Sequence, residues 1–399
     1  MNRREVLLGT GAALLSPAIA RAAVPGMSPA LPAGTREAAA MATLPGKRPM
    51  IELADRPPNY EAPLDSFTTA ITPNDRFFVR YHLAVIPEMA ELQNWKLSVG
   101  GDAAGREFGL TMAELRSLPR HTVAAVCQCS GNRRGLSDPH VPGVEWGIGA
   151  MGCARWTGAR LKDVLARAGV KPEAVEVVVE GADGPIVEAT PRFIKSIPID
   201  RALDDNTLVA YEMNGVPLPH YNGFPVRLVV PGWTATYWMK HLNSIKVVGK
   251  PFTGFWMAGA YRVPRGMFPV AKPFASQDYA PNTPITEIVV NSLVTNLADG
   301  ATVRQQFEVR GIAWDGGSGI RTVETSTDGG TTWAAARLGE DLGGFAFRPF
   351  TAAVNAKPGA AKVMVRATSK AGDVQVDKLK FNPAGYHNNV VQTLAVTVA

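Results

Sequence analysis

The sequence predicts an α+β domain followed by an immunoglobulin-like β-sandwich. Three observations support this prediction. The chain has 399 residues, a length at which two domains are expected. Strand and helix signals are interspersed between residues 60 and 270 without the regular rhythm of a βαβ fold. From about residue 281, strand-like runs recur with turn signals and little helix.

Residues 1–22 are typical of an export signal. Arg3 and Arg4 precede an apolar run rich in Gly and Ala, and small residues surround Arg21 at its end. These are the basic region, apolar region and cleavage site of a signal peptide. The paired arginines favour the twin-arginine export route, with an ordinary secretory signal as the alternative. We expect cleavage after Ala22 or nearby and a periplasmic mature protein.

The next segment, residues 23–60, is rich in Ala, Pro and Gly. This composition predicts an extended arm rather than part of a core. Residues 57–63 contain three prolines and predict a loop into the first domain, residues 61–278. The boundary near residues 278–282 leaves residues 279–399 for the sandwich.

Local signals predict the first elements of the α+β domain. Residues 77–83 have the composition of a strand. Thr111 and Glu114 form a capping box for a short helix that ends before Pro119. Residues 123–126 are apolar and predict a strand that delivers the cysteine-containing segment to its end.

A second helix and further strands follow. Thr157 is expected to cap a helix that ends at Gly169. The apolar face of this helix comprises Leu161, Val164, Leu165 and Ala168. Strands are expected at residues 175–179, 208–211 and 226–230, the last two beside Asn-Gly turns.

The sandwich prediction depends on alternation and turns. Residues 307–310 alternate in polarity. Residues 328–330, Asp-Gly-Gly, separate two strand-like runs and predict a β-hairpin. Further strands are expected at residues 363–366 and 374–376.

Composition excludes some classes of protein. The net charge is +6 and the basic residues are dispersed, so nucleic-acid binding is not supported. No run after the signal reaches the roughly 18 apolar residues of a membrane span. The three cysteines are Cys127, Cys129 and Cys153, an odd number that leaves at least one thiol unpaired. Their spacing fits neither a paired-cysteine zinc site nor a haem or iron–sulfur motif.

The most informative segment is residues 127–135, Cys-Gln-Cys-Ser-Gly-Asn-Arg-Arg-Gly. A thiolate is a soft ligand suited to a redox metal. The guanidinium group presents a rigid set of donors that fits oxyanions. We infer a metal that reacts with a small anion. The alternative is that Cys129 is a buried, inert thiol, which is the usual fate of a cysteine.

These and other motifs, in the same order, resemble the sulfite oxidase family of molybdenum enzymes. The resemblance spans nearly the whole mature chain. The matching segments are residues 78–83, 129–134, 143–146, 154–156, 158–161, 211–219, 223–227 and 326–333. It implies a sulfite-oxidase-type molybdopterin-binding catalytic domain at residues 61–278 and a sandwich of the dimerisation type after it. Three departures are Tyr81 in place of Asn, Asn222 in place of His, and a less basic run at residues 236–240.

The resemblance implies a molybdenum–molybdopterin cofactor with one molybdenum per chain. Cys129 would be the only protein ligand of the metal, and the pterin would supply the other sulfur ligands. Cys127 would be a structural thiol and Cys153 a packing residue. The implied cofactor contacts are Phe78, Arg80, Tyr81, His82, Cys129, Asp183, Asn222, Arg227, Trp238 and Lys240.

The resemblance also implies the substrate site. Arg80, Arg134 and Arg348 match the arginines that surround the substrate pocket, where charge-assisted hydrogen bonds would hold sulfite. Arg133 is expected to pack the loop or face solvent.

Two aromatic residues complete the implied catalytic set. Tyr261 matches the active-site tyrosine, whose hydroxyl can assist proton movement, and Tyr211 is a competing candidate. Trp146 is expected on the pocket wall, with ordinary core packing as the alternative.

On this resemblance we expect a sulfite dehydrogenase that passes electrons to an external c-type cytochrome. No haem and no flavin are expected in this chain. A homodimer or a complex with a cytochrome subunit is expected, with no nucleic acid and no membrane span. The alternatives are a sulfane dehydrogenase acting on carrier-bound sulfur, another molybdenum oxidoreductase for an oxyanion such as nitrate, and a non-catalytic binding module.

Overall fold

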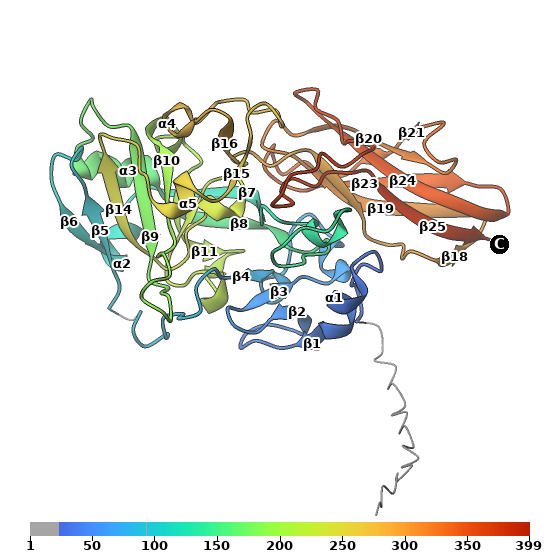
Figure 1. Cartoon of the computed structure of the whole chain (residues 1–399), viewed down its shortest axis with the longest axis horizontal. Helices are drawn as coiled ribbons and strands as arrows, with labels where there is room; N and C mark the ends of the chain where they lie inside the picture. Colours follow the sequence, from blue (N-terminus) through green and yellow to red (C-terminus); the bar gives the residue numbers. More distant parts are fainter. Residues whose placement is uncertain (1–23, 93) are drawn as a thin grey trace, which may run out of the picture.

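The computed structural model describes residues 24–92 and 94–399. The expected export signal, residues 1–22, lies outside these residues. Figure 1 shows an N-terminal α+β part at the left and a β-sandwich at the right, with a small sheet below their junction. The α+β prediction with a following sandwich is therefore confirmed. No described helix is long and apolar enough to cross a membrane.

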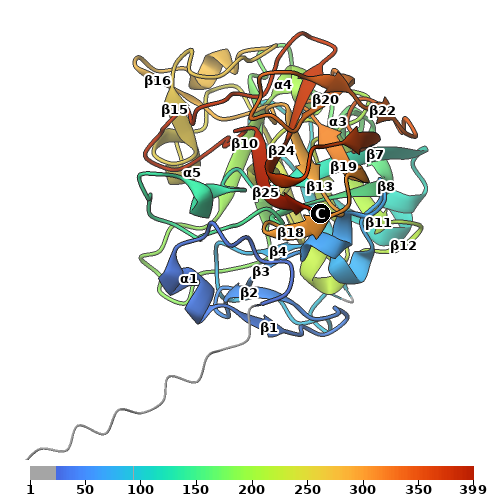
Figure 2. The ribbon, with the colours of Figure 1, turned by 90° about the vertical axis from the view of Figure 1, so that its right-hand side faces the viewer.

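The small sheet is formed mainly by the segment that was expected to be an extended arm. Its antiparallel strands, in spatial order, are β1 (Ala40–Ala42), β2 (Met50–Ala54), β3 (Asn59–Glu61) and β4 (Val79–Arg80). Met50 and Tyr60 are 1% and 3% exposed and belong to the main hydrophobic core. The arm prediction is therefore wrong, because backbone pairing with β4 incorporates this Ala- and Pro-rich segment into the fold. Helix α1 (Ala33–Ala38) lies beside the sheet in Figures 1 and 2.

Two five-stranded sheets form the rest of the N-terminal part. The first contains, in spatial order, β10 (Ile194–Pro198), β9 (Glu176–Gly181), β14 (Leu242–Val248), β5 (Lys96–Gly100) and β6 (Phe108–Thr111). The second contains β12 (Val216–Pro217), β11 (Leu208–Met213), β8 (Met151–Arg160) and β7 (Arg120–Gln128), with β13 (Arg227–Val229) also paired to β11. Only the β14–β5 pair within these sheets is parallel.

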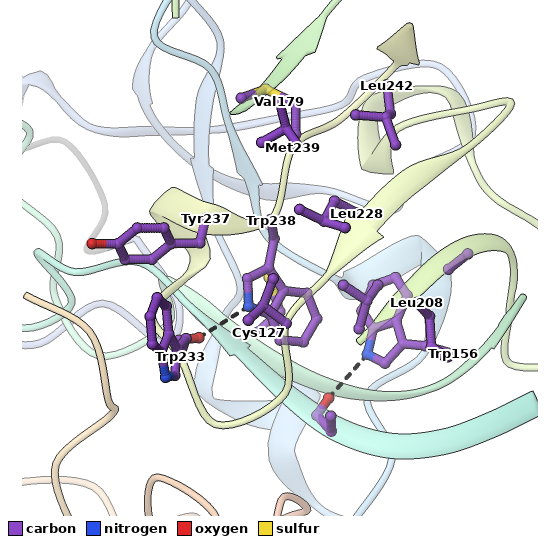
Figure 3. Packing of buried hydrophobic residues seen from close by; sticks show 14 of the residues in the cluster. Cys127, Trp156, Val179, Leu208, Leu228, Trp233, Tyr237, Trp238, Met239 and Leu242 are labelled. Atoms are coloured by element: carbon purple, nitrogen blue, oxygen red, sulfur yellow. Dashed lines mark hydrogen bonds between the residues drawn. The ribbon is translucent and has the colours of Figure 1, made fainter. Parts of the chain in front are cut away.

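The core of this part is rich in tryptophan. Figure 3 shows Trp156 and Trp238 packed beside Cys127, with Trp233 nearby. The indole of Trp238 donates to the carbonyl of Trp233 at 3.0 Å. The indole of Trp156 donates to the carbonyl of Ala125 at 3.0 Å. A buried indole needs such a partner, so these bonds fix the two rings within the core.

The helices are short. The capping box of Thr111 and Glu114 is present at the start of α2 (Met112–Arg116), as predicted. Helix α3 (Leu161–Ala168) buries the predicted apolar face and ends at Gly169, which has a φ of 71°. Thr157 does not cap it, because β8 continues to Arg160, directly before the helix. The others are α4 (Ile199–Ala202), α5 (Phe255–Ala258) and the 3-10 helices η1 (Leu64–Phe67), η2 (Asn74–Arg76), η3 (Arg134–Leu136), η4 (His220–Asn222), η5 (Ala235–Tyr237) and η6 (Ala275–Gln277).

A two-stranded sheet and two larger sheets form the C-terminal part. Strands β15 (Arg262–Pro264) and β16 (Asn282–Pro284) pair across the predicted boundary. One sandwich sheet contains β17 (Asn291–Val294), β19 (Gln306–Trp314), β23 (Arg348–Asn355) and β22 (Arg337–Leu338). The other contains β18 (Ala301–Val303), β25 (Gln392–Val398), β24 (Gly359–Ser369), β20 (Ile320–Ser326) and β21 (Ala334–Ala335). Figure 2 views the molecule from the sandwich end.

The sandwich has a hydrophobic core of its own, which includes Val309, Val323 and Val365. The predicted Asp-Gly-Gly hairpin joins β20 to β21. Two strand predictions were too long. Residues 374–376 make only isolated bridges, and the strand expected at residues 77–83 is limited to β4.

Candidate active site

One pocket brings together every residue that was predicted to contact the cofactor. Besides Tyr261, its lining includes Phe78, Arg80, Tyr81, His82, Cys129, Asp183, Asn222, Arg227, Trp238 and Lys240. It encloses about 630 Å³ of space free of protein atoms, including its open mouth. The segments that meet here are far apart in the sequence, so the pocket is a product of the tertiary fold.

Cys129 lies one residue beyond the end of β7 and is 8% exposed. Its backbone N–H donates to the carbonyl of Ala150 at 2.9 Å. The next turn is tight: a side chain at Gly131 would meet the Arg134 guanidinium at 2.5 Å. The thiol is thus presented to the pocket from a strand end followed by a compact turn.

Both domains hold this turn, residues 129–134, which we call the cysteine loop. Gln128, directly before it, accepts a hydrogen bond from the indole of Trp314 at 2.6 Å. Arg133 is 4% exposed and donates to the Asn291 side chain at 2.8 Å and to the Val390 carbonyl at 3.0 Å. Burial lowers the pKa of Arg133 to about 10, which leaves it charged at neutral pH. Arg133 is therefore a loop-packing residue, one of the two roles expected for it.

The other two cysteines are also buried and free. Cys153 lies in β8 and is fully buried, and burial raises its thiol pKa to about 12. Cys127 lies in β7 and also lines the pocket, with Arg227 Nη2 at 3.8 Å from its sulfur. Burial raises its pKa to about 11, so its thiol stays protonated. Both are inert thiols at neutral pH.

Arg80 reaches the pocket from the end of β4. Its Nη1 donates to the side-chain oxygen of Asn59 at 3.2 Å and also contacts the carbonyl of Tyr81. Lys240 Nζ donates to the Arg80 carbonyl at 2.7 Å. The backbone and one guanidinium nitrogen are therefore fixed while the residue lines the pocket.

Tyr261 and His82 form a hydrogen-bonded pair in the pocket. The Tyr261 hydroxyl contacts His82 Nε2, and the His82 ring stacks on Phe193 with centroids 3.7 Å apart. Burial, and then the charge of Arg80, hold the pKa of His82 well below its ordinary value. The imidazole is neutral at neutral pH, so one ring nitrogen can accept a proton or hydrogen bond. Tyr261 has a positive φ of 59°, a conformation that is uncommon for a residue other than glycine.

Two further basic side chains, Arg227 and Lys240, line the pocket. Arg227 is 4% exposed and donates to the carbonyls of Asn222 and Trp238 at 3.0 and 3.2 Å. Burial lowers the pKa of Lys240 well below its ordinary value, and the carboxyl of Asp183 opposes this shift. Desolvated cations of this kind favour an anionic ligand.

Three predicted substrate or wall residues do not line the pocket. Arg348 belongs to β23, where its Nη1 lies 3.1 Å from the carboxylate of Asp341. Its predicted contact with substrate stays a prediction, because its Nε and Nη1 are buried without a hydrogen-bond partner among the described residues. Trp146 is fully buried against Phe78, with ring centroids 6.5 Å apart. Its Nε1 has no hydrogen-bond partner among the described residues, so its place on the pocket wall stays a prediction.

Arg134 does not line the pocket, and its guanidinium binds backbone carbonyls. Its Nε donates to the Ala384 carbonyl at 2.7 Å and its Nη1 to the Val144 carbonyl at 3.2 Å. Its guanidinium lies 5.5 Å from the ring centroid of Tyr386. The competing candidate, Tyr211, lies in β11, and the guanidinium of Arg116 covers its ring at 4.5 Å.

Sequence reasoning missed several residues of the site. Tyr386, from the C-terminal domain, stacks on Tyr261. The Nζ of fully buried Lys195 lies 5.0 Å from the Tyr261 ring centroid. Phe193 and Ser130 line the pocket. Only Ser130 had a sequence signal, because it lies within the cysteine loop.

The pocket fits a polar, anionic cofactor. Ser130 Oγ and Arg227 Nε are buried, and neither has a hydrogen-bond partner among the described residues. Buried polar atoms are normally satisfied, so these two require a ligand or water in the pocket. Cys129 would be the thiolate ligand of a metal, and Arg227 and Lys240 would hold an anionic group of the pterin.

Family comparisons agree with this assignment. The model described as "Oxidoreductase molybdopterin binding domain" matches residues 82–256, and "Mo-co oxidoreductase dimerisation domain" matches residues 282–399. The fold and site thus define a molybdopterin-binding oxidoreductase with a dimerisation-type domain.

Individual relatives narrow the class to a family. The chain is 38% identical over 305 residues to the mitochondrial sulfite oxidase of Rattus norvegicus, covering 74% of this chain and 54% of that protein. It is 31% identical over 324 residues to the sulfite oxidase of Arabidopsis thaliana, covering 75% and 78%. The chain belongs to the sulfite oxidase family of molybdopterin enzymes. It spans about half the length of the mammalian relatives it matches.

A solved structure supports the fold. The sulfane dehydrogenase SoxCD from Paracoccus pantotrophus superposes with a TM-score of 0.71 and 24% sequence identity. The match covers 87% of this chain and 88% of that chain. The two-domain arrangement is therefore shared with that protein.

Proposed function

We propose that the protein is a sulfite dehydrogenase that oxidises sulfite to sulfate at a molybdenum–molybdopterin centre. Electrons would pass to an external c-type cytochrome. The observation that carries the proposal is the meeting of Cys129, Arg80 and Tyr261 in one cationic pocket. Membership of the sulfite oxidase family supports the choice of substrate.

Arg80 is the residue that would bind the substrate anion. Sulfite offers three acceptor oxygens, and a guanidinium group can donate two parallel, charge-assisted hydrogen bonds to an oxyanion. The Nη1 of Arg80 is used by Asn59 and Tyr81, whereas Nη2 and Nε have no partner among the described residues. These two nitrogens are the donors available to an anion in the pocket.

Tyr261 and His82 would accept and donate protons or hydrogen bonds during the reaction. Because His82 is neutral, its Nε2 can accept the hydrogen bond of the Tyr261 hydroxyl, which leaves the phenol oxygen to face the pocket. That oxygen can then accept a hydrogen bond from a protonated substrate or a water molecule. When bound, the molybdenum–pterin group would supply oxygen transfer and two-electron chemistry.

The proposal includes export and an electron-accepting partner. The paired arginines Arg3 and Arg4 support export by the twin-arginine route to the periplasm. A c-type cytochrome is a natural acceptor in that compartment. The match to a dimerisation domain supports a homodimer, with a complex with a cytochrome subunit as the alternative.

The test is expression with the export signal in a host that makes molybdopterin. Molybdenum content would be measured together with sulfite-dependent reduction of ferricyanide and of cytochrome c. We expect about one molybdenum per chain and activity with both acceptors. Molybdenum without sulfite activity would overturn the substrate. Ferricyanide reduction without cytochrome c reduction would overturn only the acceptor.

A second candidate is oxidation of a sulfur atom attached to a carrier. The observation that favours it is the loss of two predicted substrate arginines from the lining: Arg348 pairs with Asp341, and Arg134 binds backbone carbonyls. A single substrate-binding arginine suits a less highly charged substrate than free sulfite. Sulfite activity with a micromolar to millimolar Michaelis constant, the ordinary range for enzymes, would reject this candidate.

A further inference from the structure

We propose that Asn59 is a positioning residue for Arg80 and that it thereby sets the affinity of the pocket for an oxyanion. This inference rests on the proposed function, because it assigns Arg80 to the substrate. It gives a role to the N-terminal segment, residues 24–61, which contains none of the family motifs found in the sequence.

The backbone places Asn59 directly opposite Arg80. The two residues are cross-strand partners in the antiparallel β3–β4 pair. Side chains at such positions lie on the same face of the sheet and interact. The result is the 3.2 Å hydrogen bond from Arg80 Nη1 to Asn59 Oδ1.

The orientation of the Asn59 amide is fixed by a second bond. Asn59 is 2% exposed, and its Nδ2 donates to the Pro57 carbonyl at 2.8 Å. Since the nitrogen is committed to Pro57, the oxygen faces Arg80. An arginine side chain has many rotamers, and a buried acceptor for Nη1 reduces the number it can adopt. Asn59 therefore holds the guanidinium so that Nη2 and Nε remain available to an anion.

The same segment is attached to the rest of the domain at two other points. The Glu61 carboxylate accepts hydrogen bonds from the backbone N–H groups of Gly147, Ile148 and Gly149 at 2.7 to 2.9 Å. Lys47 Nζ donates to the side-chain oxygen of Asn222 at 2.6 Å. A substitution at Asn59 therefore leaves the segment anchored, so its effect on Arg80 can be measured in a folded protein.

The test uses Asn59→Asp and Asn59→Ala in the molybdenum-loaded, full-length protein. A carboxylate at position 59 would pair with Arg80 and cancel its charge. We expect Asn59→Asp to raise the Michaelis constant for sulfite and the inhibition constant for sulfate by more than about tenfold. Asn59→Ala loses only the positioning bond, so a rise of about three- to tenfold is expected. The turnover number and the molybdenum content should stay near those of the wild type.

A matched control is Asn296→Asp in the C-terminal domain. Asn296 is half-buried rather than buried, but like Asn59 its side chain is hydrogen-bonded, here to the backbone of Glu308 and Arg310 at 2.8 Å. Asn296→Asp should change neither the Michaelis constant for sulfite nor the inhibition constant for sulfate. A general loss of stability would lower the turnover number and molybdenum content instead of separating the two kinetic constants.

The outcomes separate this inference from the proposed function. If the wild type oxidises sulfite and Asn59→Asp leaves both constants unchanged, the role of Asn59 is overturned and the function stands. If the wild type does not oxidise sulfite, the function fails. The role of Asn59 is then tested by the increase in unfolding temperature that sulfate causes. A smaller increase in Asn59→Asp than in the wild type supports this role, and an equal increase overturns it.

Discussion

Tyr386 of the C-terminal domain stacks on Tyr261 of the molybdopterin-binding domain, with ring centroids 5.5 Å apart and planes 14° from parallel. Arg134 covers the Tyr386 ring from the cysteine loop. The candidate catalytic tyrosine is therefore held from one side by His82 and from the other by the second domain. The C-terminal domain contributes directly to the site.

The first prediction concerns this stacking. Tyr386→Ala removes the ring that supports Tyr261 and should lower kcat/KM for sulfite by roughly three- to tenfold, the scale of an aromatic pair. Tyr386→Phe keeps the ring and should retain nearly all activity. Steady-state kinetics of both variants provides the measurement. If Phe were as damaging as Ala, the hydroxyl group and not the stacking would be responsible.

The second prediction concerns the metal ligand. Loss of a residue that hydrogen-bonds to a metal ligand typically reduces activity by roughly 10- to 100-fold. Cys129→Ser removes the ligand itself and should reduce sulfite turnover by more than this. The control is Cys153→Ala, which alters a buried thiol in β8 that does not line the pocket. It should keep its molybdenum. Full activity with full molybdenum content in Cys129→Ser would reject the ligand assignment.

The third prediction separates two arginines that the sequence placed together. Arg80→Ala removes the anion-binding guanidinium and should raise the Michaelis constant for sulfite by roughly 10- to 100-fold. Arg348→Ala removes a group that pairs with Asp341 outside the pocket and should change this constant by less than about twofold. Equal effects of the two substitutions would contradict the structural placement of Arg348.

The fourth prediction concerns the pH dependence of stability. Burial raises the pKa of Glu61 to about 7, against an ordinary value of 4.5. The folded state therefore binds this proton more tightly than the unfolded state. The resulting stabilisation is present in full below about pH 4.5 and is lost as the pH rises towards 7. Its size is on the order of 3 kcal/mol.

Glu61→Gln removes this titration and should make the fall in unfolding free energy between pH 4.5 and 7 shallower. Denaturant unfolding at several pH values provides the measurement. Glu308→Gln, at an exposed carboxylate, is the matched control and should keep the slope of the wild type. An unchanged slope in Glu61→Gln would show that Glu61 does not titrate in this range.

Part of the pocket lining could be predicted because its residues lie within motifs. Cys129, His82 and Arg227 each belong to a short run whose residue types are constrained together. Apart from Ser130, the residues that sequence reasoning missed are brought to the site by tertiary contacts alone. Tyr386 and Asn59 each occur in a segment without a recognised motif, and nothing local indicates that they meet Tyr261 and Arg80.

The direction of the Arg348 side chain could not be predicted for a different physical reason. Its aromatic neighbours correctly predicted a partly buried environment, but they do not indicate direction. Successive side chains of an extended chain point to opposite sides. Phe347 packs against Trp314 and Phe67, and Arg348 therefore points away from them towards Asp341.

The hydrogen bonds between the cysteine loop and the C-terminal domain constrain when this loop can reach its final structure during synthesis. Arg133 in this loop is held by Asn291 and Val390, and Arg134 is held by Ala384. Asn291 and Val390 follow Arg133 in the chain by 158 and 257 residues, and Ala384 follows Arg134 by 250 residues. The ribosome therefore adds these partners long after the loop. A nascent chain that has exposed only its first domain therefore cannot yet form these three hydrogen bonds. The contacts that hold the cysteine loop are therefore complete only after the last-made segment of the chain has docked.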